Sequence, residues 1–284
     1  MKIDESKIKK YNEVRAEFNL IRLENAKELY EMLYVLDLVF TKFDIEYSLA
    51  FGSILGAIRN KGLIPWDDDI DVMTFEQPGN GDIIYREEVL REFNKYGMNV
   101  LFQYAVRTWE RRFKPPYLLN GIYKESNQNF LVPKPIKIKR CSMWGSKQKS
   151  LCGGGYLANG RTFRGGGVFI LDIFPMKNYE KTRWRSAVSA YKQAKTDILT
   201  TDEIFPLKKN NFGNTEVSTI NENEKFCKRV YGENCFTDAK YKRSHTCGKT
   251  HPSRVNKINS EANRDLLINL EVPSLFDPHG FKTI

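Results

Sequence analysis

Two aspartates that alternate with apolar residues are the feature that most constrains this sequence. The run Asp69-Ile70-Asp71-Val72-Met73 is typical of a β-strand with one polar face. Residues two apart on a strand point to the same side, so Asp69 and Asp71 are predicted to lie together. Two like charges so close favour a bound cation, and their oxygens suit Mg²⁺ or Mn²⁺. The alternative is a solvated acidic turn over Asp67–Asp71.

The segment before these acids predicts a phosphate-binding turn. Residues Ile45–Phe51 form a short alternating run that stops at Gly52-Ser53, and Ile54–Arg59 predicts a short helix that Ser53 could cap. Backbone N–H groups at the start of a helix attract phosphate. Gly52 and Ser53 are therefore candidate substrate contacts facing the metal site, although an ordinary turn with an N-cap fits the same residues.

A third acid, Asp172, stands in the otherwise apolar run Val168–Phe174, which predicts a buried strand. An unpaired buried carboxylate costs several kcal/mol, so Asp172 needs a metal or a hydrogen-bond donor. If this strand lies beside the one with Asp69 and Asp71, Asp172 completes the metal site or accepts the proton of an attacking hydroxyl. The alternative is a strand-end aspartate that caps a turn before Pro175.

Apolar periodicity predicts several further elements. The steps of four, three and four residues from Leu29 to Phe40 indicate an amphipathic helix within Leu20–Phe43. Other elements are predicted as helices at Arg86–Lys95, Lys181–Leu199 and Glu261–Ile268, and as a strand at Met98–Tyr104.

Other parts of the chain are predicted to lack long regular elements. Prolines within Arg107–Leu151 predict loops and short edge strands, and the glycine triplets around 153–167 predict hinges of a mobile loop. Asn210–Asn223 is predicted to be a polar loop, and the chain beyond Tyr241 a loosely attached tail.

Composition limits the setting in which such a site works. The net charge of +10 over 284 residues favours an anionic partner, but no nucleic-acid motif appears, so no specific nucleic acid is predicted. The N-terminus lacks the apolar run of a signal peptide, and Met32–Phe40 is too short for the roughly 20 residues that cross a bilayer. Five cysteines, an odd number, suit reduced thiols. A soluble, cytoplasmic protein is the simplest expectation.

A zinc site near the C-terminus is a minor alternative. Cys227, Cys235, His245, Cys247 and His251 carry the right ligand atoms, but their spacing fits no standard zinc finger.

The whole run from Ala50 to Val72, which includes Gly52-Ser53 and Ile64-Pro65-Trp66-Asp67-Asp68-Asp69-Ile70-Asp71, closely resembles the signature of the LicD family, which includes fukutin and the fukutin-related protein. Leu171-Asp172-Ile173-Phe174-Pro175 looks like the second acidic strand of that family. Ile204–Leu207 and Val230–Asn234 look like its weaker downstream motifs. The resemblance covers roughly Ala26 to Cys235, which predicts a catalytic domain over 21–235 between extensions at 1–20 and 236–284.

The resemblance implies an α+β, nucleotidyltransferase-like fold with a small mixed β-sheet flanked by helices. It also implies transfer of a phosphate-linked group (phosphocholine, a polyol phosphate or a sugar phosphate) from a nucleotide-activated donor, most often CDP-linked, to a hydroxyl of a glycan or glycolipid. Carried over by position, Asp69 and Asp71 hold the metal, Asp172 is the third acid, and Gly52 and Ser53 contact the donor phosphate. Many family members have Thr where Ser53 stands, and the hydroxyl is kept.

Four more residues complete the predicted substrate site. Arg59 and Lys61 would offset charge on the leaving nucleotide, although solvated surface charges fit the same residues. Trp66 and Asp67 come just before the acid pair. Two rival functions fit the same residues: an enzyme that transfers the nucleotide itself, and an inactive module that binds anionic glycans or nucleic acid. The positive charge would also permit contact with an anionic membrane surface, where a lipid-linked acceptor would be found.

Overall fold

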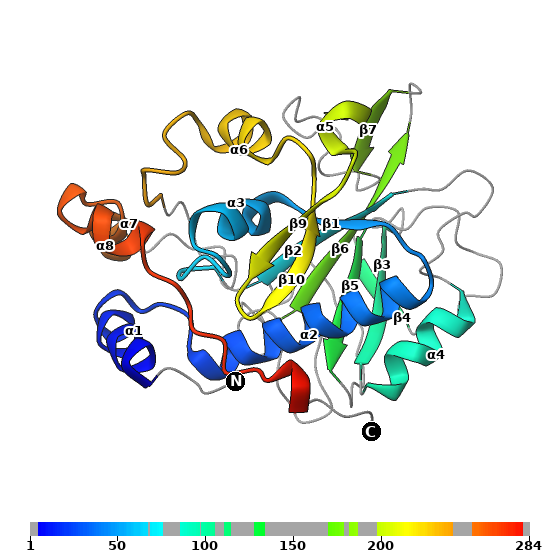
Figure 1. The fold of residues 1–284 in the computed structure, drawn as a ribbon, viewed down its shortest axis with the longest axis horizontal. Helices are drawn as coiled ribbons and strands as arrows, with labels where there is room; N and C mark the ends of the chain where they lie inside the picture. The colour runs from blue at the N-terminus through cyan, green and yellow to red at the C-terminus, as the bar shows by residue number, and fades with distance from the viewer. Residues whose placement is uncertain are drawn as a thin grey trace.

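The structure is a computed structural model in which helices and strands are mixed (Figure 1). It describes residues 5–67, 69–75, 86–96, 98–105, 111–114, 128–133, 170–178, 182–186, 198–240 and 252–280. The predicted α+β class is confirmed. The two glycine triplets lie outside the described residues.

The helices are α1 (Glu5–Phe18), α2 (Leu23–Lys42), α3 (Phe51–Arg59), α4 (Glu87–Lys95), α5 (Thr201–Ile204), α6 (Asn223–Tyr231), α7 (Pro252–Ile258) and α8 (Arg264–Ile268), with 3₁₀ turns at Glu261–Asn263 and Pro278–Gly280. The strands are β1 (Tyr47–Leu49), β2 (Asp69–Phe75), β3 (Met98–Ala105), β4 (Arg111–Lys114), β5 (Gln128–Pro133), β6 (Ile170–Asn178), β7 (Arg183–Ser186), β8 (Leu199–Thr200), β9 (Lys208–Phe212) and β10 (Thr215–Thr219).

The main sheet is mixed and places the two acidic strands side by side. Its order is β1-β2-β6-β5-β3-β4, with β7 added to β6 and β8 to β7. The pair of β2 and β6 is parallel, and Asp71 stands opposite Asp172 in its register. The other pairs of this sheet are antiparallel. The condition on which a role for Asp172 depended is therefore met by the topology.

The sequence predicts only loops and edge strands within Arg107–Leu151, which is confirmed for β4 and wrong for β5. β4 is at the edge of the sheet, but β5 is an interior strand between β6 and β3. Pro133 is its last residue, which is why a proline is tolerated there.

α2 supplies much of the hydrophobic core. Its residues Leu29, Leu33, Leu36 and Phe40 are all fully buried, as the periodicity predicts. The helix packs against β2, β5 and β6, so it covers the part of the sheet where the two acidic strands meet. In Figure 1 it runs along the sheet, with α1, α7 and α8 at one end of the molecule and α4 at the other.

The helix predicted at Lys181–Leu199 is wrong at both of its ends. Arg183–Ser186 forms β7 and Leu199–Thr200 forms β8, and the two strands pair antiparallel. Trp184 explains the difference, because its ring packs edge-on against Phe75 at 5.7 Å and near Phe205 at 6.1 Å. This burial holds the segment on the sheet edge.

The polar loop predicted at Asn210–Asn223 is also wrong. β9 and β10 form an antiparallel hairpin whose turn contains Gly213 at a φ of 66°. Only Phe212 and Val217 of its strands are buried apolar residues, so its hydrophobic alternation is weak. The left-handed backbone of the turn requires a residue such as glycine.

The C-terminal part is not a loose tail over residues 252–280. Five of its apolar side chains are buried in one hydrophobic cluster with the rest of the chain: Ile258, Leu267, Leu270, Val272 and Phe276. The same cluster includes Tyr11 and Phe18 of α1. The helical patch predicted at Glu261–Ile268 is confirmed as a 3₁₀ turn followed by α8.

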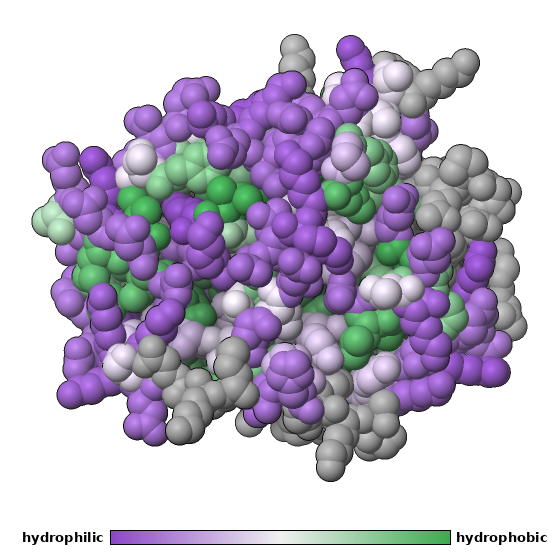
Figure 2. All heavy atoms as spheres, viewed as in Figure 1, coloured by the Kyte–Doolittle hydropathy of each residue, from purple (hydrophilic) through white to green (hydrophobic). Residues whose placement is uncertain are grey.

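Across the residues that the structure describes, no helix has the length and apolar character that crossing a membrane requires. Figure 2 shows one face of the molecule on which hydrophilic side chains dominate and hydrophobic areas are separate and small.

Candidate functional site

The start of α3 is fixed directly onto the acid strand β2. The N–H of Ala50 donates to the C=O of Asp71 at 2.8 Å, and the N–H of Asp71 donates to the Ser53 hydroxyl at 2.9 Å. Ala50, not Ser53, is the N-cap residue, because α3 begins at Phe51. The predicted capping role of Ser53 is therefore wrong. Its hydroxyl accepts the hydrogen bond of Asp71 N–H in β2, at a position beyond the end of the paired residues of β1.

Phe51 brings β6 into the same junction. It has a φ of 44°, which is uncommon for a residue with a side chain, and strained residues of this kind cluster at active sites. Its ring packs edge-on against Phe174 of β6, with 5.1 Å between ring centroids. The turn from β1 into α3 is thus held against both acidic strands.

The acids occupy neighbouring positions on the two parallel strands. In β2, Asp69 is only 8% exposed and Asp71 is half-buried, and their spacing places them on one side of the strand. Asp172 occupies the position opposite Asp71 in β6. Its side chain lies outside the described residues. Among the side chains that are described, no three of His, Cys, Asp or Glu are grouped closely enough to hold a metal ion.

Asp67 lies against the first turn of α3. A Cβ added to Gly52 would lie 3.1 Å from the Asp67 carboxylate, so this acid approaches the helix start closely. A carboxylate is favourable there because the N-terminal end of a helix carries partial positive charge. Gly52, Ser53 and Asp67 are therefore brought together with Asp71, and their role as substrate contacts stays a prediction.

Arg59, the last residue of α3, contacts Trp66 and the segment after α6. The Arg59 guanidinium donates to the C=O of Cys235 at 3.0 Å and of Asp238 at 3.2 Å, and its centre lies 5.2 Å from the Trp66 ring centroid. Burial lowers the pKa of Arg59 to about 10, although the nearby charge of Asp67 opposes this shift. Arg59 thus ties the end of α3 to the segment after α6. Trp66 is a buried neighbour of Arg59, only 9% exposed.

Lys61 follows α3 on the surface. Its ammonium group donates to the C=O of Ile58 at 3.1 Å, and its backbone has a φ of 57°.

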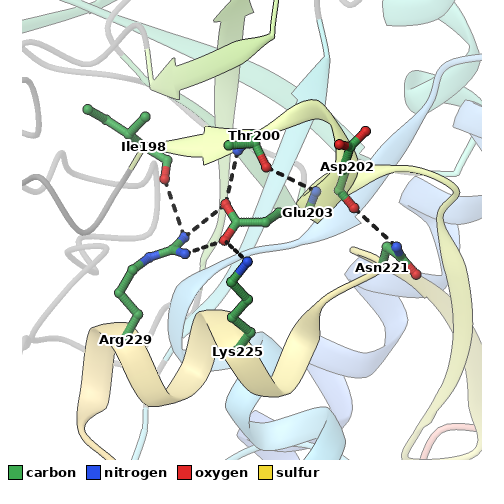
Figure 3. Close-up of polar contacts among 7 residues, drawn as sticks. All are labelled: Ile198, Thr200, Asp202, Glu203, Asn221, Lys225 and Arg229. Carbon is green, nitrogen blue, oxygen red and sulfur yellow. Dashed lines mark hydrogen bonds and ion pairs between the residues drawn. The ribbon is translucent and has the colours of Figure 1, made fainter.

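A charged cluster around Glu203 was missed by sequence reasoning (Figure 3). Its carboxylate, 6% exposed, accepts hydrogen bonds from the Arg229 guanidinium and from the N–H of Thr200 at 3.0 Å, and lies 3.4 Å from the Lys225 ammonium. The Thr200 hydroxyl in turn accepts from the N–H of Glu203, which completes a capping box for α5. The run Thr200-Thr201-Asp202-Glu203 has a threonine followed three residues later by a glutamate. This capping-box pattern is the signal by which the sequence could have predicted the start of α5 and the position of Glu203.

A cavity of about 550 Å³ runs along α6 next to this cluster, lined by Glu222, Glu224, Lys225, Lys228, Arg229 and Glu233. Three acidic and three basic residues line it, so it carries no net charge that would select an anion. None of the predicted site residues contributes to its lining.

The pKa of Glu203 is lowered below its ordinary value. Burial alone would raise it, but hydrogen bonds from Arg229 and Thr200 and the charges of Arg229 and Lys225 outweigh the burial. A carboxyl group with a lowered folded-state pKa stabilises the protein above its unfolded pKa, about 4.5, and this contribution is lost as pH falls through the folded pKa.

Replacing Glu203 by glutamine should therefore lower stability at pH 7 and matter less in acid. We expect the urea midpoints of the wild-type and Glu203→Gln proteins to differ near neutral pH and to converge below pH 4.5. Glu224→Gln, an exposed acid of α6, should follow the wild type throughout. A constant gap between Glu203→Gln and the wild type from pH 7 to pH 3 would contradict this prediction.

Two cysteines of the zinc alternative lie within the described residues. Cys227 and Cys235 are both buried, and burial raises the pKa of the Cys227 thiol to about 12. The zinc site stays a minor alternative. His245, Cys247 and His251 lie outside the described residues.

Comparison with known families agrees with the motif. Residues 44–151 match the family model described as LicD/FKTN/FKRP, nucleotidyltransferase domain. The LicD resemblance is confirmed. The matched segment begins just before β1, includes α3 and β2 with Asp69 and Asp71, and ends before β6, so Asp172 lies beyond it.

Curated relatives match over stretches of 31 to 126 residues. A protein of Haemophilus influenzae named lipopolysaccharide cholinephosphotransferase LicD is 64% identical over 31 residues, 11% of this chain and 12% of that protein. An uncharacterized protein of Rickettsia prowazekii is 26% identical over 126 residues, 44% of this chain and 42% of the relative. An uncharacterized protein of Rickettsia typhi is 31% identical over 77 residues, which are 27% of this chain and 24% of the relative. The chain thus spans less than half of the length of each of these curated relatives.

Proposed function

We propose that this protein is a metal-dependent phosphotransferase of the LicD type with a nucleotidyltransferase-like fold. It transfers a phosphate-linked group (phosphocholine, a polyol phosphate or a sugar phosphate) from a nucleotide-activated donor, CDP-linked in the first instance, to a hydroxyl of a glycan or glycolipid. The observation that carries the proposal is the junction in which Ala50 and Ser53 fix the start of α3 onto Asp71.

This junction joins two features that phosphoryl transfer needs. The first turn of α3 offers partial positive charge to a donor phosphate at Gly52 and Ser53. Asp69 and Asp71 lie next to it on β2, and Asp67 approaches the same helix start. A phosphate there would be repelled by these carboxylates unless a cation offset their charge. The donor set therefore favours a metal at this place.

The residues present suit Mg²⁺ or Mn²⁺, because carboxylate oxygens are the ligands that these hard cations prefer. Asp69 and Asp71 would hold the ion, with Asp172 as the third acid from β6. When bound, such an ion neutralises charge on the phosphate oxygens. The Asp71 backbone is fixed through Ser53 and Ala50, so that the carboxylate is held by a rigid main chain.

The proposed chemistry is an in-line displacement at the donor phosphorus. An oxygen of the acceptor hydroxyl forms the new P–O bond while the bond to the nucleoside monophosphate breaks. The hydroxyl proton passes to a carboxylate, for which Asp172 is the candidate, and the nucleotide leaves with the bonding electron pair. The protein contributes mainly positioning and charge compensation.

Nucleotidyl transfer is the second candidate function, and the description of the matching family as a nucleotidyltransferase domain favours it. In that reaction the nucleotide itself is joined to the acceptor and pyrophosphate or another group leaves. The mass of the product distinguishes the two reactions. An inactive module that binds anionic glycans or nucleic acid would give neither product.

The experiment that tests the proposal is donor turnover. The purified protein is incubated with Mg²⁺ and CDP-, GDP- and UDP-linked compounds, beside an Asp69→Ala, Asp71→Ala double variant. We expect release of nucleoside monophosphate from one donor, CMP from a CDP-linked compound, and none from the double variant. Equal release by both proteins would overturn the assignment of the acids. No release from any donor, together with metal-independent glycan or nucleic-acid binding, would favour the inactive module.

The net charge of +10 supports an anionic partner in addition to the donor. A lipid-linked acceptor at an anionic membrane surface fits this charge, and peripheral contact through basic side chains would bring the enzyme to it.

A further inference from the structure

The connecting loop, residues 60–67, joins α3 to the acid strand β2 and is held by distant parts of the chain. Backbone groups at alternate positions of the loop are bound from outside it. The bonds are Gly213 N–H to Lys61 C=O at 2.7 Å, Leu63 N–H to the Tyr30 hydroxyl at 3.2 Å, and Ile21 N–H to Pro65 C=O at 2.9 Å. The hairpin, α2 and the segment before α2 therefore all fix the path of this loop.

A fourth segment, the C-terminal strap (residues 267–276), reaches the same loop. The Asn60 side-chain amide donates to the C=O groups of Ile268 and Leu270, each at 3.1 Å. Asn60 is only 1% exposed, so these bonds are shielded from water. The Tyr30 hydroxyl donates to the C=O of Val272 at 3.1 Å while it accepts from Leu63 N–H. One hydroxyl thus joins the strap to the loop.

The strap is itself well anchored and can act as a brace. Leu267, Leu270 and Val272 are buried, and the Phe276 ring lies 5.2 Å from that of Tyr34 on α2. Apolar burial fixes it to the core independently of its bonds to the loop. Its backbone carbonyls are therefore presented to Asn60 and Tyr30 in set positions.

We infer that the C-terminal strap positions the connecting loop for catalysis, and that Asn60 and Tyr30 are positioning residues. The inference rests on the proposed function, because the loop carries Asp67 and leads directly into Asp69 and Asp71. Catalytic groups must be held within about 0.5 Å of their productive positions, and a shift of about 1 Å costs about 10²-fold in rate. The strap supplies this precision from outside the segment that matches the LicD family.

Tyr30→Phe tests the link, because it removes the hydroxyl and keeps the buried ring. Tyr47→Phe is the matched control: the Tyr47 hydroxyl is also buried, donates to Asp37 at 2.6 Å and is bonded by the Ser218 backbone, and neither of these bonds is to the loop. Both full-length variants are measured by donor turnover and by hydrogen–deuterium exchange of peptides that cover residues 60–67.

We expect Tyr30→Phe to speed exchange in the connecting loop about tenfold or more and to lower kcat about 10- to 100-fold with a smaller change in KM. Tyr47→Phe should leave both readouts close to those of the wild type. Equal losses of kcat in the two variants would show a general stability effect and overturn the inference. Unchanged exchange in the loop of Tyr30→Phe would overturn it as well.

Asn60→Ala provides a second test with Asn269→Ala as its control. Asn269 is an exposed residue of the same strap whose amide bonds to Asp265, so its loss leaves the loop contacts in place. Only Asn60→Ala should raise loop exchange and lower kcat. If the wild-type protein turns over no donor, the proposed function fails, whereas the exchange comparison still decides whether the strap holds the loop.

Discussion

Replacing Asp71 by asparagine is expected to lower donor turnover by about 10³-fold, the loss typical of removing a key electrostatic group from an active site. The substitution keeps the shape of the side chain. It also keeps the backbone bonds of residue 71 to Ser53 and Ala50, so the junction with α3 should stay intact. Asp69→Asn should act similarly, because both acids lie on one side of β2. Release of nucleoside monophosphate measures the loss, and calorimetric titration with Mn²⁺ measures metal binding without any reaction.

Two other aspartates serve as controls for this prediction. Asp67→Asn should reduce turnover much less, because Asp67 lies over the start of α3 and not on β2. Asp202→Asn, an exposed residue of α5, should leave turnover unchanged. Mild and equal losses at positions 67, 69 and 71 would count against a metal site on β2. Unaltered Mn²⁺ binding in both Asp69→Asn and Asp71→Asn would do the same.

Gly213→Ala is expected to have the largest effect on stability, about 2–5 kcal/mol in the free energy of unfolding, from left-handed strain and overpacking together. The residue has a φ of 66°, and an added Cβ would lie 2.5 Å from Cε1 of Tyr30. That ring is fully buried and its hydroxyl bonds to both Leu63 and Val272, so it cannot move aside freely. Urea unfolding gives the free energy directly.

Gly232→Ala separates the two causes of this loss. Gly232 has a φ of 97° but nothing within 4 Å of an added Cβ. Its replacement should therefore lower the free energy of unfolding only by the cost of backbone strain, about 1–3 kcal/mol. A double-mutant cycle adds Tyr30→Leu, which removes the outer ring atoms. In that background the cost of Gly213→Ala should fall to the backbone term. The same cost with and without the Tyr30 ring would refute the steric argument.

The centre of the candidate site could be predicted because its signals are local. The alternation of Asp69 and Asp71 with apolar residues defines a strand, and β2 forms over these residues. The apolar run around Asp172 likewise defines β6. Their parallel register, with Asp71 opposite Asp172, could not be predicted, because it depends on the long connection between the two strands and on the packing of α2 across them.

Roles that depend on backbone partners could not be predicted either. Ser53 has the side chain of an N-cap, and only the fold shows that its hydroxyl serves Asp71 N–H. Arg59 is predicted from its sequence context to offset charge on a nucleotide, yet its hydrogen bonds go to the Asn60 side chain and to two backbone carbonyls after α6. Hydropathy carries no signal for such contacts. It also gave the wrong structure for β7 and the hairpin, where one or two buried side chains decide the conformation.

The central place of β6 limits where this protein can be cut. β6 lies between β2 and β5, yet it comes from beyond residue 151, where the family match ends. A fragment of residues 44–151 would lack the strand that joins its two halves, leaving β1-β2 and β5-β3-β4 as separate ribbons with unpaired edges. Exposed edges of this kind pair with other chains and promote aggregation. The unit of sequence similarity is therefore smaller than the unit that can fold, and expression trials should keep both α2 and β6.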